Sequence, residues 1–149
     1  MRFDQPWLRL FLALLLSLAL TACGNNTPPK GLAPGRDIVR HAIARQLTLT
    51  EDRLTNQLDN PSTTEFEIKN LNIKNLTPVY IADLPTYKIS GTYSLKLKLP
   101  RQDITQNKNT FEVYLQRQIE GKTWRLLIRK NESNQEEKKV KTWASYLVT

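Results

Sequence analysis

The sequence predicts an α+β domain, in which an N-terminal helix and a short second helix pack on a curved antiparallel sheet of four to five strands. Two observations predict this fold. Apolar residues recur every three or four positions over residues 36–46, as they do on one face of a helix. From Glu65 onward they recur at every second position, as in half-buried strands. The 149 residues, of which 40% are hydrophobic, suffice for one such domain.

Two helical segments are expected, the first over about residues 36–46 and the second over residues 51–58. The apolar stripe of the first consists of Ile38, Val39, Ala42, Ile43 and Leu47. Thr50 is the expected N-cap of the second helix, with Leu54 and Leu58 on its buried face.

The strands follow in order from Glu65. Alternation reverses its parity near Asn70, which predicts a β-bulge there. The clearest strand covers residues 87–99, where the odd positions are apolar or glycine and the even positions are polar. Gly91 interrupts this strand and is expected to allow a bend. Further strands are expected over residues 111–119, 124–128 and 143–148, with a tight turn at 120–122.

Residues 1–22 have the features of a secretory signal peptide. Arg2 and Arg9 supply positive charge, and residues 10–20 form an almost wholly apolar run. A helix that spans a bilayer needs about 20 apolar residues, so this shorter run predicts a cleaved signal and not a permanent anchor.

The run ends in Leu20-Thr21-Ala22-Cys23, which resembles the lipobox of bacterial lipoproteins. The resemblance implies cleavage between Ala22 and Cys23, a diacylglycerol thioether on the Cys23 thiol, and acylation of the new amine. Cys23 is the single cysteine of the chain, and only a thiolate is nucleophilic enough for this bond. Two or more acyl chains hold a protein stably on a membrane. We therefore expect a lipid-anchored protein on the exocytoplasmic side of a membrane, either periplasmic or at the cell surface.

Residues 23–35 are expected to be a flexible tether, because residues 25–35 hold three prolines and two glycines. Residues 36–149 then form a single domain. In element order this domain resembles the cystatin-like and NTF2-like folds. Both folds host enzymes, ligand pockets and binding domains, so the resemblance implies an architecture and no function.

No catalytic residue, metal ligand or cofactor is predicted, and we expect a protein that is not an enzyme. His41 is the single histidine, the carboxylates are scattered, and no phosphate-binding or nucleophile motif is present. Residues 43–58 resemble a helix-turn-helix, but Glu51 and Asp52 occupy its recognition segment. These acidic residues and the export signal argue against a nucleic-acid partner.

Two binding functions remain, both suited to a membrane surface. The formal net charge is +8, and Lys88, Lys96 and Lys98 share the exposed face of the strand over residues 87–99. This face is a candidate docking site for acidic lipid or for an acidic component of the membrane or envelope. It predicts a non-catalytic interaction or accessory domain, although a solvated face kept soluble by its charge has the same pattern.

The alternative function is a small-ligand-binding domain with a cavity between helix and sheet. Aromatic residues are candidates to line such a cavity or simply to fill the core. They are Tyr80, Tyr87, Tyr93, Trp124 and Trp143.

Overall fold

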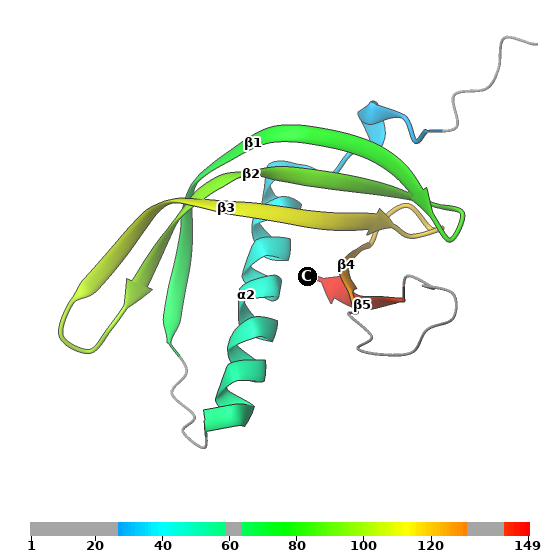
Figure 1. The fold of residues 1–149 in the computed structure, drawn as a ribbon. Coiled ribbons are helices and arrows are strands. Elements are labelled where there is room, and N and C mark those ends of the chain that lie inside the picture. Colours follow the sequence, from blue (N-terminus) through cyan, green and yellow to red (C-terminus); the bar gives the residue numbers. More distant parts are fainter. Residues whose placement is uncertain (1–26, 59–63, 131–141) are drawn as a thin grey trace, which may run out of the picture.

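The computed structural model describes residues 27–58, 64–130 and 142–149, in which one long helix packs on a five-stranded antiparallel sheet (Figure 1). The predicted α+β class is therefore confirmed. The sheet order is β1-β2-β3-β4-β5, so each strand pairs with the strand that follows it in the chain. The elements are the 3-10 helix η1 (Lys30–Leu32), the helix α2 (Arg36–Leu58), and the strands β1 (Glu65–Ile81), β2 (Leu84–Lys98), β3 (Asp103–Arg117), β4 (Trp124–Arg129) and β5 (Trp143–Val148). The predicted signal peptide, its cleavage site at Ala22 and the lipidation site Cys23 lie outside the described residues.

A single helix replaces the two helices that the sequence predicts. α2 runs without a break for 23 residues, including the expected turn around residues 47–50. The hydroxyl of Thr48 donates to the Ala44 carbonyl at 3.1 Å, and that of Thr50 donates to the Gln46 carbonyl at 2.8 Å. Both threonines thus satisfy their hydroxyls within the helix, and Thr50 does not cap a new one. The prediction of a separate second helix is wrong, and the helix-turn-helix pattern has no turn.

Only the first half of α2 lies in the core. Val39, Ala42 and Ile43 are at most 1% exposed, whereas Leu54 is 53% exposed. Leu54 was expected on a buried face, but the core ends near Leu47 and the helix continues beyond it. Figure 1 shows this second half of α2 extending past the centre of the sheet.

Buried side chains fill the inner face of the sheet, which is the face toward α2. Its most deeply buried members are Tyr87, Ile89, Val113, Leu115 and Leu126. The rings of Tyr87 and Trp124 pack with centroids 6.0 Å apart. These two aromatic residues therefore fill the core and do not line a cavity.

β1 carries the predicted bulge, which divides the long paired strands β1 and β2 into two segments. Its pairing with β2 shifts register between Lys69 and Asn72, and Asn70 has a φ of 50°. Opposite the bulge, a Cβ atom on Gly91 would lie 2.0 Å from the Asn72 carbonyl oxygen. Gly91 is thus required because the backbone of β1 approaches β2 too closely for any side chain. Figure 1 shows β1, β2 and β3 arching over α2.

The hairpin between β3 and β4 matches its predicted turn. Gln118 N donates to the Thr123 carbonyl at 3.1 Å, and Gly121 has a φ of 72°. Arg117 donates from Nε and Nη2 to the Gly121 carbonyl at 3.1 and 2.8 Å, which holds this side chain against the turn. β3 begins at Asp103, eight residues before the predicted start at residue 111, and its first half is exposed.

The segment before α2 packs on the domain. Pro28 is fully buried, and the Tyr87 hydroxyl donates to the Pro29 carbonyl at 2.7 Å. Arg36 Nη2 donates to the Leu71 carbonyl of β1. The prediction of a flexible tether is therefore wrong for residues 28–35, because the prolines that suggested a linker are part of the packed structure, and its residues 23–26 lie outside the described residues.

Candidate ligand-binding site

The three lysines of the predicted docking face lie on the outer face of the sheet, away from α2, and each meets a carboxylate. Lys88 Nζ lies 3.1 Å from Glu112 Oε2. Lys96 Nζ lies 2.7 Å from Asp103 Oδ2, and Lys98 Nζ lies 2.7 Å from Glu65 Oε1. The lysines and carboxylates alternate across β1, β2 and β3, so the pairs neutralise much of the charge that the sequence pattern suggests.

These ion pairs favour the charged forms of Lys88, Lys98 and Asp103 through their effect on the pKa of each. The hydrogen bond to Glu112 raises the pKa of Lys88 above its ordinary value, and the bond to Glu65 does the same for the pKa of Lys98. The hydrogen bond from Lys96 lowers the pKa of Asp103. Each lysine therefore lies beside a carboxylate that offsets its charge.

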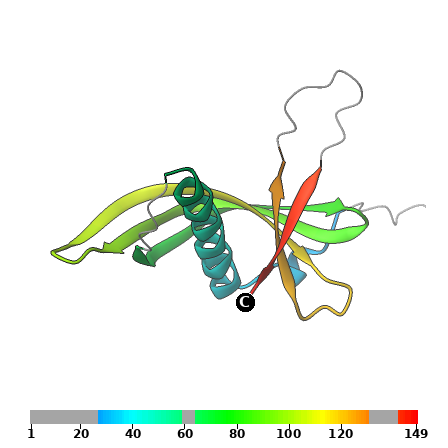
Figure 2. The same cartoon turned by 90° about the horizontal axis from the view of Figure 1, so that it is seen from below.

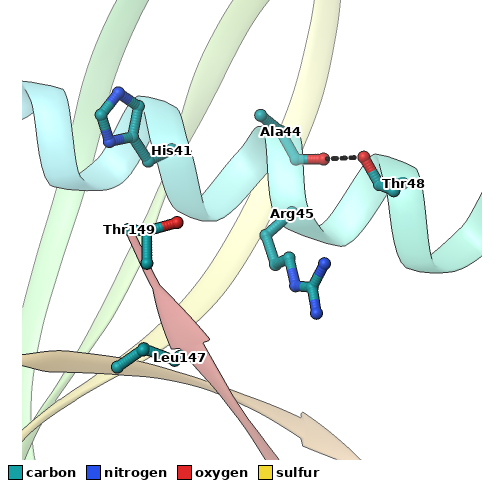
Figure 3. A pocket seen from close by; sticks show the side chains of 6 residues that line it. All are labelled: His41, Ala44, Arg45, Thr48, Leu147 and Thr149. Atoms are coloured by element: carbon teal, nitrogen blue, oxygen red, sulfur yellow. Dashed lines mark hydrogen bonds between the residues drawn. The ribbon is translucent and has the colours of Figure 1, made fainter.

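His41 lies on the exposed side of α2, beside a small hollow of about 200 Å³ (Figure 3). The hollow is lined by His41, Ala44, Arg45, Thr48, Leu147 and Thr149. Figure 3 shows Thr48 bonded to its own helix, and no acidic side chain lines the hollow to orient the imidazole. Within residues 27–58, 64–130 and 142–149, no cluster of three or more His, Cys, Asp or Glu side chains is placed to hold a metal ion.

A larger, apolar groove lies between the second half of α2 and the inner faces of β1 and β2. Its volume is about 440 Å³, within the range of about 300–1,000 Å³ that is usual for ligand sites. We call it the distal groove. Its apolar lining consists of Leu47, Leu54, Phe66, Leu95, Leu97 and Leu99, and its polar rim of Thr50, Glu51, Thr55 and Thr64.

The polar groups at the rim are already engaged within the chain. The Thr64 backbone N–H donates to Glu51 Oε1 at 3.1 Å. The hydroxyls of Thr50 and Thr55 donate to carbonyls one turn back in α2, at 2.8 and 2.7 Å. The distal groove therefore offers a ligand mainly apolar contact, with the carboxylate of Glu51 at its rim.

The backbone of β2 beneath the distal groove is engaged on both edges, by β1 and β3, whereas β1 is an edge strand. Phe66 pairs with Leu97 and Ile68 with Leu95 in the antiparallel ladder of β1 and β2. An extended peptide lying over β2 in the groove would find no ladder partner there, and its buried N–H and C=O groups would be left unsatisfied.

Two neighbouring hollows are less suited to an apolar ligand. One, of about 560 Å³, is lined partly by Arg40, Glu67 and Lys69. Lys69 pairs with Glu67 at 3.3 Å, so this hollow is lined by charges that already have partners. The other, of about 240 Å³, lies on the side of α2 that faces Tyr93 and Phe111.

The leucine lining of the distal groove was not predicted, although its signal is present in the sequence. Leu95, Leu97 and Leu99 continue the odd-numbered alternation of the strand over residues 87–99, and Leu47 and Leu54 are spaced seven apart. The leucines of the strand and those of the helix line one groove because α2 is one continuous helix. Thr48 and Thr50 led instead to the prediction of a break in that helix.

Comparisons with known proteins add no family to these observations. No protein-family model, curated protein or solved structure matches the chain. The resemblance to cystatin-like and NTF2-like folds therefore stays a prediction. None of the helices in the described part of the chain has the length and apolar character needed to cross a bilayer.

Proposed function

We propose that this protein is a lipid-anchored, non-catalytic binding domain at the exocytoplasmic surface of a membrane, and that the distal groove binds an acyl chain. The observation that carries the proposal is the apolar groove between α2 and the sheet. The lipobox at Cys23 supports the location, and it brings the domain close to a supply of acyl chains.

The chemistry of the distal groove favours an acyl chain over other apolar ligands. Each methylene group of an acyl chain that is buried in the groove contributes about 0.8 kcal/mol and needs no hydrogen-bond partner. An extended peptide would bury unsatisfied backbone groups, and a helical peptide is about 10 Å across. At the rim the Thr50 hydroxyl is engaged within α2 and one oxygen of Glu51 accepts the Thr64 N–H, so few polar groups are left to recognise a polar small molecule.

A titration with a fluorescent long-chain fatty acid tests this function. The chain starting at residue 23, with Cys23→Ser, keeps every described residue and removes the lipid. We expect it to bind one equivalent. Leu54→Glu, at a position that is 53% exposed, should weaken binding about tenfold through the loss of about two methylene contacts and the added charge.

Ile119→Glu is the matched control, because Ile119 is 90% exposed and lies in the turn between β3 and β4. It should bind as the parent chain does. Absence of binding, or equal weakening by both substitutions, contradicts the proposal. Displacement of the probe by an apolar peptide but not by unlabelled fatty acid would also reject the acyl chain as the ligand.

A further inference from the structure

A stack of aromatic and arginine side chains lies on the outer face of the sheet, over β3, β4 and β5. The ring centroids of Tyr114 and Trp143 are 5.0 Å apart. The guanidinium carbon of Arg129 lies 5.3 Å from the Tyr114 ring centroid and 5.2 Å from that of Trp143. Arg129 Nη2 also donates to the Tyr114 hydroxyl at 3.0 Å. Together with Lys88 and Arg125 we call these residues the outer aromatic patch.

The patch is held in place by its neighbours. Lys88 Nζ lies 5.8 Å from the Tyr114 ring centroid, on the side away from Arg129's strand. Arg125 Nε donates to Ser145 Oγ at 2.5 Å. Leu127 pairs with Tyr114 in the ladder and is only 5% exposed, although it lies on the outer face. The side chains around Leu127 therefore cover a buried apolar residue, and protein surfaces that contact a partner also have an apolar centre.

The two arginines of the patch differ from its Lys88, which pairs with Glu112. Neither Arg125 nor Arg129 has a carboxylate ion partner among the residues that the structure describes. Their hydrogen bonds go to the neutral groups of Ser145 and Tyr114. Among the described residues, the positive charges of Arg125 and Arg129 thus lie beside the aromatic rings without a carboxylate partner.

The point where the chain enters the domain limits how far the patch can lie from the membrane; this step rests on the lipid anchor proposed at Cys23. The chain enters the domain at Pro28, which is buried, and at Pro29, whose carbonyl accepts from Tyr87 on the inner face of the sheet. Five peptide links separate Cys23 from Pro28, so their Cα atoms lie at most about 18 Å apart whatever the conformation between them. Figures 1 and 2 both show η1 on the side of α2 where β4 and β5 lie.

We propose that the outer aromatic patch docks the domain on an anionic phospholipid surface. Trp and Tyr rings favour the headgroup region, where one end of the side chain is apolar and the other is hydrated. Arginine is attracted by anionic headgroups and buries its stem while its guanidinium stays hydrated. The short span between Cys23 and Pro28 keeps the η1 end of the domain near the membrane, and the second half of α2, with the distal groove, points to the other end of the molecule (Figure 1).

Vesicle co-sedimentation of the chain starting at residue 23, with Cys23→Ser, measures the domain without its lipid. We expect binding to vesicles of phosphatidylcholine and phosphatidylglycerol in equal parts, and weak or no binding to phosphatidylcholine alone. Arg125→Gln with Arg129→Gln should weaken binding about 30-fold, at about fivefold for each charge.

Lys96→Gln with Lys98→Gln is the matched control. It removes the same charge from the same face at positions that are paired with Asp103 and Glu65, and it should cost less than fivefold. Leu54→Glu should bind vesicles as the parent chain does, which separates the patch from the distal groove.

Tryptophan emission locates the contact. After residue 22 the chain holds only Trp124 and Trp143, and Trp124 is 9% exposed in the core. A blue shift on mixed vesicles that disappears in Trp143→Phe supports the proposal. It is overturned if the chain does not bind mixed vesicles, if the lysine control weakens binding as much as the arginine pair, or if the shift persists in Trp143→Phe. Fatty-acid binding and lipid attachment at Cys23 are measured separately, so the proposed function can survive this failure.

Discussion

Replacement of Gly91 by alanine tests the close approach of β1 and β2 on which the shape of the sheet depends. A Cβ atom at this position would lie 2.0 Å from the Asn72 carbonyl oxygen and 3.0 Å from Phe111 Cε1. The first contact is with backbone, which cannot turn away as a flexible side chain can. The ladder of β1 and β2 would have to open next to the bulge at Asn70, where the pairing is already shifted.

The expected cost is about 3 kcal/mol, at the upper end of what overpacking a core costs. Alanine recovers about 0.5–1 kcal/mol over glycine through the smaller entropy of the unfolded chain, so the clash prevails. For a domain of this size, Tm should fall by about 10 °C.

Thermal and urea unfolding of the chain from residue 23, followed by circular dichroism, provide the measurement. Gly31→Ala is the control, since no atom lies within 4 Å of the Cβ position there. It should change the free energy of unfolding by less than about 0.5 kcal/mol. If Gly91→Ala is as stable as the control, the two backbones are not in contact and the account of the bulge is refuted.

Two further predictions concern the tyrosines of the core. Tyr87→Phe removes the hydrogen bond to the Pro29 carbonyl, and the free energy of unfolding measured in urea should fall by about 1 kcal/mol. Proteolysis within residues 28–35 should become faster. An unchanged urea midpoint and cleavage rate would show that this bond does not hold residues 28–35 on the domain. Burial raises the pKa of Tyr93 above its ordinary value, so its contribution to stability is complete below about pH 10 and is lost as the pH rises through the raised pKa. The free energy of unfolding should therefore fall above pH 10, and less steeply in Tyr93→Phe; equal slopes would contradict this reasoning.

The sequence predicted the elements whose two faces differ in polarity. In β2, odd residues such as Ile89 are buried while Lys88 and Lys96 stay on the other face, so alternation alone was sufficient. The parity change near Asn70 located the bulge for the same reason. The first half of β3 gave no such signal, because residues 103–108 are exposed whichever way their side chains point.

The features that were missed depend on partners distant in sequence. Thr48 and Thr50 resemble a helix break until their hydroxyls are seen to bond within α2. The lysine face appeared uncompensated because only the strand register brings Lys88 to Glu112, 24 residues further along the chain. Trp143 was a candidate to line a cavity or to fill the core, and its place beside Tyr114 follows from the pairing of β4 with β5.

Lipid attachment at Cys23 is the central claim, since both the supply of acyl chains and the nearness of the membrane depend on it. Mass spectrometry of the N-terminal peptide of the protein, isolated from membranes of a bacterial host, tests it most directly. Lipidation predicts a chain that begins at Cys23 and carries a diacylglycerol thioether, and a Cys23→Ser variant that is neither lipidated nor cleaved after Ala22. An unmodified thiol at Cys23, or a serine variant that is processed and retained as the parent is, would contradict it.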